Sequence, residues 1–266
     1  LARRLVDVRR AQRIGLDAGL IEQREPARRS AIAVSSLTFV LGATIMVLLH
    51  EGSHAVAAAL PEGAMTESPR TTTDPATARN SGTVIAEPPA VSLLLFVHHV
   101  EDLAPGLYLL ARGKDHAQRL QQQLRTPHLS WQAVPGYNVP LFCLSHNTDW
   151  RDAAQLVSCR QEIAADGALA VAMLADFDAT LSDTGPGAYR SLFWECGLLG
   201  QILYLQAEAA GLSGTGIGCF YDDLLHRIIG LDLEEEQWQS LYHFTIGGRE
   251  EDRRLRSSAA YAHLQR

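Results

Sequence analysis

The most strongly patterned stretch of the chain predicts a long helix over residues 188–210. Apolar side chains recur there at helical spacing, and further leucine and isoleucine residues widen the apolar face until it covers most of the helix. A helix that is apolar on most sides packs inside a protein or within an interface. Regularly spaced polar side chains argue against a membrane span, and Gly211 is predicted to end the helix.

A glycine-rich run, a second helix and a strand follow. Residues 214–220 (GTGIGCF) contain three alternating glycines, which let a backbone approach a flat ligand and adopt a positive φ. Asp222 and Asp223 suit the start of a helix, because carboxylates accept hydrogen bonds from the free amides there. Gly230 ends this helix, and the β-rich run 242–246 predicts a strand.

The middle of the chain shows both strand and helix patterns. The apolar runs 91–97 and 140–144 are short enough for buried strands, and a hairpin with its turn at 105–106 is predicted after the first of them. Residues 115–124 have the pattern of a polar surface helix. The stretch 152–178 predicts one long core helix, because its apolar residues recur at helical spacing and its small residues permit close packing.

We divide the chain into three segments. Residues 1–60 form an N-terminal helical segment, 61–90 a flexible loop rich in Pro, Gly, Thr and Ser, and 91–266 the domain core. Residues 1–29 have the pattern of a basic amphipathic helix. Such a helix can touch a membrane surface or a phosphate, but a solvated helix that packs on a neighbour is the commoner arrangement.

Composition narrows the functional classes. The 266 residues carry a formal net charge of −7, which argues against a general nucleic-acid binder, because binding phosphates requires a basic surface. Cys143, Cys159, Cys196 and Cys219 show no paired spacing, so we expect buried free thiols in a reducing cytosol. No secretory signal opens the chain, which predicts a cytoplasmic protein. Residue 1 is Leu rather than Met, which suggests a fragment of a longer polypeptide.

The stretches YRSLFWECGLLGQILYLQAEAAGLSGTGIGCFYDD and YHFTIGG, in this order, resemble the FMN-dependent nitroreductase superfamily. They are most similar to its branch of SagB-type, or thiazole/oxazole-forming, dehydrogenases. The resemblance covers roughly residues 91–255. It implies an α+β fold, in which helices wrap a central, mostly antiparallel sheet and FMN binds at a dimer or tandem-domain interface.

The resemblance also implies a function. Hydride would pass through the bound flavin from NADH, NADPH or an organic donor to an unknown small-molecule or peptide substrate. The helices predicted at 152–178 and 188–210 would build the domain core and much of the seam of a homodimer, or of a contact with a tandem partner domain. Neither nucleic acid nor a membrane is expected as a partner.

The cofactor site follows from the resemblance, which assigns no catalytic side chain. An Arg-Arg-Ser run resembles the Arg-x-Ser opening of the family, so Arg28, Arg29 and Ser30 would hold the FMN phosphate through guanidinium and hydroxyl donors. Ile32 departs from the family, which usually carries a second base there. Arg254 stands where the family has a phosphate-binding base after its last strand.

The glycine-rich run would contact the flavin ring. The backbone of Gly216, Ile217, Gly218 and Cys219 is expected against the flavin, with Gly218 and Cys219 at its reactive N5 edge. Cys219 stands where the family has a small residue, so its amide matters more than its thiol.

Two alternatives lie outside this interpretation. His50, Glu51 and His54 match H-E-x-x-H, in which both imidazoles would bind one zinc ion and the carboxylate would act as general base of a metallopeptidase. We prefer a buried amphipathic helix in which the two histidines do no chemistry. The other alternative is a nitroreductase-like module that binds no cofactor and serves for dimerisation or for binding a peptide.

Overall fold

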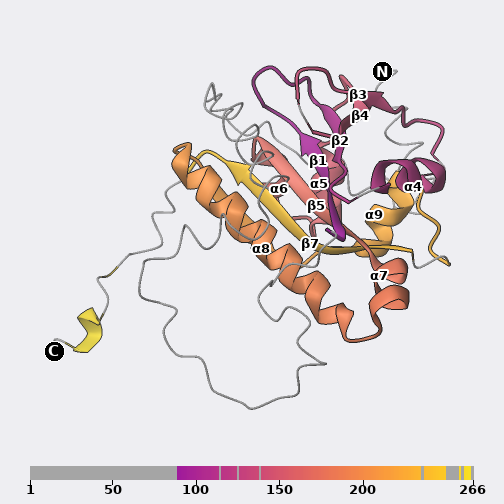
Figure 1. The fold of residues 1–266 in the computed structure, drawn as a ribbon. Coiled ribbons are helices and arrows are strands. Elements are labelled where there is room, and N and C mark those ends of the chain that lie inside the picture. Colours follow the sequence, from indigo (N-terminus) through magenta and orange to yellow (C-terminus); the bar gives the residue numbers. More distant parts are fainter. Residues whose placement is uncertain are drawn as a thin grey trace, which may run out of the picture.

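The computed structural model describes residues 89–249 except 114, 125, 138, 235 and 236, together with residues 258 and 261–264. A seven-stranded sheet lies at its centre, with the strand order β3-β4-β2-β1-β5-β7-β6 (Figure 1). Every neighbouring pair is antiparallel, which confirms the predicted α+β fold with an antiparallel sheet. The strands are β1 (Val91–Val97), β2 (Gly106–Leu110), β3 (Gln132–Ala133), β4 (Leu141–His146), β5 (Leu169–Asp176), β6 (Ser213–Ile217) and β7 (Trp238–Gly247).

Helices cover both faces of the sheet. The helices are α4 (His116–Gln123), α5 (Arg151–Val157), α6 (Ile163–Asp166), α7 (Phe177–Thr184), α8 (Ala188–Ala209) and α9 (Asp222–Ile229), with a 3-10 helix η2 (Ala262–Leu264). Side chains alternate between the two faces of a strand, so β1 contributes to two hydrophobic layers. Val91, Leu93 and Leu95 pack in the layer that contains α8, whereas Leu94 and Phe96 pack in the layer that contains α4, α5, α6 and α9. Figure 1 shows α8 crossing one face of the sheet.

Several predicted elements are confirmed. The strand expected at 91–97 is β1 with the same bounds, and those expected at 140–144 and 242–246 lie within or overlap β4 and β7. The helices expected at 115–124 and 188–210 are α4 and α8. Gly230 ends α9 with a φ of 80°, the left-handed conformation that a glycine adopts without penalty after a helix.

The stretch 152–178 is not the single helix that its pattern predicts. It contains most of α5, then α6 and the central strand β5, and α7 begins at Phe177. Every residue of β5 is buried, because β1 and β7 pair with its two edges and a hydrophobic layer covers each face. A strand buried on both faces needs apolar side chains throughout. Its sequence therefore lacks the two-residue alternation and cannot be distinguished from a buried helix by periodicity.

The hairpin between β1 and β2 forms, but its tight turn is not at 105–106. Val100 and Leu103 are bridged, and between them Asp102 has a φ of 61°. Aspartate tolerates the left-handed conformation better than most residues that carry a Cβ. Gly106 instead begins β2, where a Cβ would lie 2.0 Å from the carbonyl oxygen of Ser145. The glycine permits close strand pairing at this position rather than a turn.

A buried ion pair fixes the start of the sheet to α8. Glu195 is 1% exposed, and its carboxylate accepts hydrogen bonds from the backbone N–H groups of Ala90 (3.0 Å) and Val91 (3.2 Å). Arg112 donates to the same carboxylate at 2.5 Å and to the carbonyl oxygen of Val91 at 2.9 Å. Charges withdrawn from water need such partners, so this pair specifies where β1 begins relative to the helix.

Replacing Glu195 by Gln should lower the free energy of unfolding by about 3–5 kcal/mol, because the buried Arg112 guanidinium loses its carboxylate. Glu208→Gln is the matched control on the same helix. The Glu208 side chain is 71% exposed, with Oε2 3.9 Å from Nη2 of Arg249, so its loss should stay within about 0.5 kcal/mol. Urea denaturation measures both variants, and equal losses would contradict the role assigned to Glu195.

Candidate functional site

The predicted flavin-contacting run lies at the edge of the sheet. Gly214, Gly216 and Ile217 belong to β6, which pairs with β7 and has no other neighbour among the strands of the described residues. Gly218 and Cys219 are exposed in the loop that leads from β6 to α9. The glycine spacing alone does not predict this strand. An edge strand presents unpaired backbone donors and acceptors, so this edge can receive a ligand.

Aromatic rings pack directly against the glycines of β6. A Cβ on Gly214 would lie 2.7 Å from Cζ of Phe244, and a Cβ on Gly216 would lie 1.9 Å from the hydroxyl oxygen of Tyr242. Tyr204 of α8 packs edge-on against Phe244, with 4.7 Å between ring centroids, and its hydroxyl accepts a 2.7 Å hydrogen bond from the Gly216 N–H. Close packing therefore suffices to explain these two glycines.

Gly218 differs from the glycines within the strand. A Cβ added there would meet no atom within 4 Å, and its φ is not in the left-handed region. Neither packing within the described part of the chain nor backbone conformation thus requires a glycine at this position. Open space beside an exposed backbone is what the close approach of a flat ligand needs.

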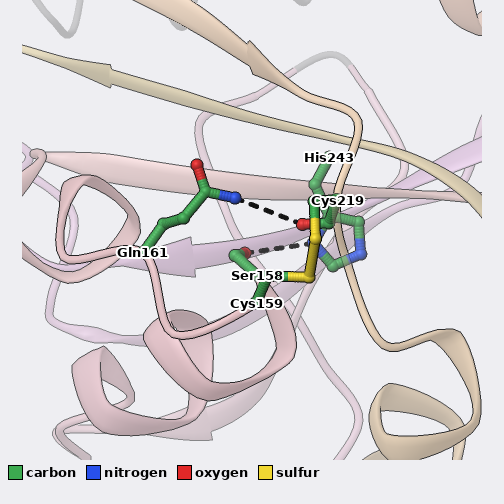
Figure 2. Close-up of a disulfide and its surroundings, with 5 residues drawn as sticks. All are labelled: Ser158, Cys159, Gln161, Cys219 and His243. Carbon is green, nitrogen blue, oxygen red and sulfur yellow. Dashed lines mark hydrogen bonds between the residues drawn. A yellow bond between two sulfur atoms is a disulfide. The ribbon is translucent and has the colours of Figure 1, made fainter.

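Cys219 forms a disulfide with Cys159, so the expectation of free thiols is wrong for this pair (Figure 2). Their Cα atoms lie 5.7 Å apart, although the two residues are separated by 60 positions in the sequence. Folding brings them together, because Cys159 lies in the connection between α5 and α6, a connection absent from the predicted single helix. Cys143 and Cys196 are free and buried, as expected, and burial raises the pKa of the Cys196 thiol to about 12.

A buried histidine of β7, His243, supports the loop that carries the disulfide. Its Nδ1 lies 3.2 Å from Oγ of Ser158, its Nε2 lies 3.1 Å from Oγ of Ser240, and its ring stacks on Phe220 with 4.6 Å between centroids. Burial lowers the pKa of His243 to about 3, so its imidazole is neutral at pH 7. His226 accepts a 3.1 Å hydrogen bond from the Ser240 N–H, and burial lowers its pKa too. Because both imidazoles and both serines are buried, the cluster is structural.

A second polar cluster resembles a Ser-His-Asp triad but cannot act as one. Oγ of Ser92 lies 2.8 Å from Nδ1 of His116, and Nε2 of this histidine lies 3.7 Å from Oδ2 of Asp176. Arg119 donates to both carboxylate oxygens of Asp176, and burial lowers the pKa of His116 to about 4. Ser92 is fully buried, and its hydroxyl accepts a 3.3 Å hydrogen bond from the Arg112 N–H. The cluster therefore joins β1, α4 and β5 without offering a nucleophile to a substrate.

Large apolar side chains cover the outer side of α8. Between 40% and 52% of their surface is exposed, and they are Tyr189, Phe193, Trp194, Tyr204 and Leu205. The Tyr189 ring lies edge-on to the Phe193 ring at 5.1 Å, and the guanidinium of Arg190 lies 5.5 Å from the Trp194 centroid. Large exposed apolar surfaces are common at binding interfaces. The sequence pattern predicts that this helix lies either inside the protein or within an interface, and a partner on this surface stays a prediction.

Part of the predicted site lies outside the described residues. This holds for Arg28, Arg29, Ser30 and Arg254, and for His50, Glu51 and His54 of the zinc alternative. Within the described ranges, no group of three His, Cys, Asp or Glu side chains could hold a metal ion. In the same ranges, none of the helices has the length and the apolar character that crossing a bilayer requires.

Three residues of the site were not predicted from the sequence. Tyr204 contacts the glycine strand β6, and His243 contacts the loop that follows it, only because β6 pairs with β7. Cys159 reaches Cys219 only after the sheet has formed. Tyr204 does have a sequence signal. It lies 15 residues after Tyr189, which places both on one face of a helix with 3.6 residues per turn.

Gly214→Ala should lower the free energy of unfolding by about 1–3 kcal/mol, because the fully buried Phe244 ring has little room to move away from a new Cβ. Gly218→Ala is the matched control and should change stability by less than about 0.5 kcal/mol, since its Cβ would point into open space. Thermal and urea unfolding measure both. A Gly218 variant as unstable as the Gly214 variant would show that Gly218 also packs against the chain.

Acidification should destabilise the fold in part through His243. Burial lowers its pKa to about 3 in the folded protein from the ordinary value of 6.5 for histidine, so between these values the unfolded state binds one more proton. The stability contribution is complete above pH 6.5 and is lost as the pH falls toward 3, at about 1.4 kcal/mol per pH unit. His243→Gln removes this titration. Urea unfolding between pH 7.5 and 5 should therefore give a shallower pH dependence for the variant, and parallel curves would contradict the assignment.

Solved structures with related folds are distant in sequence. A proposed nitroreductase from Anabaena variabilis aligns with 21% identity and a TM-score of 0.47. The alignment covers 60% of this chain and 27% of the Anabaena chain, so this chain spans little more than a quarter of the length of that protein. The McbBCD microcin synthetase complex of E. coli aligns with 13% identity and a TM-score of 0.48, over 89% of this chain and 74% of that one. A proposed nitroreductase from Ralstonia eutropha aligns with 14% identity and a TM-score of 0.42, over 86% and 89% of the two chains. None of the curated proteins matches the chain.

The family assignment rests on a different comparison. The model of the Nitroreductase family matches residues 94–248, which is more than half of the chain. The matched range begins inside β1 and ends directly after β7, so it includes the long helix α8 and the glycine run of β6. The predicted family is thereby confirmed, whereas its SagB-type branch stays a prediction. The chain belongs to the Nitroreductase family.

Proposed function

We propose that this nitroreductase-type oxidoreductase binds FMN against β6 and the loop 218–221 and uses it to transfer hydride from NADH or NADPH to an organic acceptor. Bound FMN would supply the redox chemistry, and the protein would bind and orient the reactants. The observation that carries the proposal is Gly218, whose exposed backbone has open space beside it and which the fold itself does not require to be a glycine.

The charges near the two ends of β6 favour one orientation of the cofactor. Ser213 lies opposite Gly247, two residues before Arg249, whose side chain is 68% exposed. At the other end, Asp222 and Asp223 begin α9 shortly after Gly218. Carboxylates repel a phosphate and a guanidinium attracts it. These charges support an orientation with the phosphate toward Ser213 and the flavin ring near Gly218.

The phosphate site would be completed from segments outside the described residues. Arg254 follows Arg249 in the sequence and would supply a further guanidinium to the phosphate. Arg28, Arg29 and Ser30 would add a guanidinium fork and a hydroxyl donor. The set is small, and the chain contains no G-x-G-x-x-G turn for an adenylate, which favours FMN over FAD.

Tyr204 is the side chain of the described residues best placed to assist at this edge. Its oxygen accepts the Gly216 N–H, so the hydroxyl proton stays available for a ligand, and 40% of the residue is exposed. The ring is held in place by its edge-on contact with Phe244. Tyr204 would therefore donate a hydrogen bond from a fixed position, which limits the entropic cost of binding.

The exposed side of α8 supports a paired assembly. Its exposed apolar side chains extend along the helix and include Tyr204, so a second subunit or a tandem partner domain that covers α8 as far as this residue would also approach the edge of β6. Such a partner would exclude water from the cofactor and bury the apolar surface. This arrangement agrees with the interface that the family resemblance implies.

The purified chain should carry a yellow, non-covalent flavin, and Arg254→Ala should weaken FMN binding about tenfold or more. The reason is the loss of a charge-assisted hydrogen bond to the phosphate. Arg249→Ala is the comparison variant: it removes a charge that attracts the phosphate but no proposed hydrogen bond to it, so it should weaken FMN binding less than Arg254→Ala does. FMN titration followed by fluorescence quenching measures both dissociation constants, and the visible spectrum reports the bound flavin.

Three results would contradict the proposal or its parts. Equal FMN affinities in the two arginine variants would contradict the role assigned to Arg254. If chromatography identifies the released flavin as FAD, the proposal of a small phosphate site for FMN is contradicted. Stoichiometric zinc without any flavin would favour the metallopeptidase built on His50, Glu51 and His54.

A further inference from the structure

The disulfide joins two connections that lie side by side at the candidate site. Cys159 lies between α5 and α6, and Cys219 lies in the loop 218–221 between β6 and α9 (Figure 2). Cys219 is exposed, whereas Cys159 is half-buried. Cys219 is therefore the member of the bridge on the more solvent-exposed side.

The loop 218–221 is held from one side. The Tyr221 N–H donates to the Val157 carbonyl oxygen at 2.7 Å, and Nε2 of Gln161 donates to the Cys219 carbonyl oxygen at 3.3 Å. Both partners belong to the same α5–α6 region as Cys159. On its other side the loop is open, since Gly218 has nothing within 4 Å of an added Cβ and Tyr221 is 47% exposed. The disulfide is the covalent tie among these contacts.

The backbone beside the bridge is in an unfavourable conformation. Cys159 and Arg160 have φ values of 54° and 59°, and neither is a glycine. In this region the Cβ of an L-residue crowds the backbone, so consecutive left-handed residues need surrounding contacts to hold them. Opening the bridge removes one of these contacts and allows the segment to relax.

We infer that Cys159–Cys219 is a thiol–disulfide exchange site, and that its reduction by a dithiol releases the loop 218–221 from the α5–α6 region. A thiolate of the dithiol attacks Sγ of Cys219, the S–S bond breaks, and Cys159 leaves as a thiolate that takes a proton from water. The second thiol then attacks the mixed disulfide and frees Cys219. The protein gains two electrons as two thiols, and the dithiol becomes a disulfide.

The consequence for the cofactor rests on the proposed function. If FMN lies against Gly218, the loop that reduction releases is the one that faces the flavin ring. The closed bridge keeps Gly218 and Phe220 in place, the latter stacked on His243. Reduction would then weaken FMN binding without any change at the phosphate end of the site.

Hydrogen exchange followed by mass spectrometry tests the release directly. Peptides that cover residues 218–221 should exchange at least tenfold faster in wild type treated with dithiothreitol than in the oxidised protein, while peptides of β5 stay protected. Cys159→Ser should show the fast rate without reductant. Cys143→Ala, which changes a buried free thiol, is the matched control and should keep the slow rate until dithiothreitol is added.

Alkylation with iodoacetamide and peptide mapping test the chemistry. In the native protein, Cys159 and Cys219 should be alkylated only after dithiothreitol treatment. Alkylation before reduction, resistance to dithiothreitol under native conditions, or an unchanged exchange rate after reduction would each overturn the inference.

Flavin retention separates this inference from the proposed function. Ultrafiltration should show weaker FMN binding, by about tenfold, in the reduced protein and in Cys159→Ser. Faster loop exchange with unchanged FMN binding would support the exchange site and contradict the placement of FMN at Gly218. Normal FMN binding with an unchanged exchange rate would overturn the exchange site and leave the proposed function standing.

Discussion

The fold depends on the burial of β5 on both faces and its pairing on both edges. Residues 169–176 are all buried, and β1 and β7 pair along the strand. Because an unpaired backbone group in this position would have neither water nor a partner, the two neighbouring strands must form for β5 to be stable. The position of β7 in turn fixes β6, and with it the exposed edge that carries the candidate site.

The long helix α8 connects the sheet's structural core with its exposed edge. Near its beginning, Glu195 binds the start of β1 together with Arg112, and both charges are buried. Near its end, Tyr204 binds the Gly216 N–H at the edge strand. One rigid element therefore sets the distance between the anchored strand and the glycine run. The apolar side chains on its outer face stay free to contact another subunit or domain.

Patterns that depend on neighbouring residues predicted much of this arrangement. The bounds of β1 follow from a short apolar run, and those of α8 and α9 follow from their periodicity and from Gly211 and Gly230. The prediction of one helix over 152–178 failed because a strand buried on both faces has no polar alternation to reveal it. The sequence did not predict the disulfide and the His243 cluster for a different reason. The residues of each meet only through pairing between distant strands. At the candidate site, the sequence singled out the glycine run but did not show which of its glycines packing requires.

The difference between the glycines shows how packing and binding share one short segment. Gly214 and Gly216 let aromatic rings lie against β6, so they stabilise the edge strand itself. Gly218 lies one residue beyond the strand, where the disulfide, Val157 and Gln161 hold the loop from its inner side. A backbone that is fixed on one side and open on the other is already arranged for a ligand, so binding need not order it first. For the proposed FMN site, the contacts that constrain this loop are therefore those that would tune the affinity.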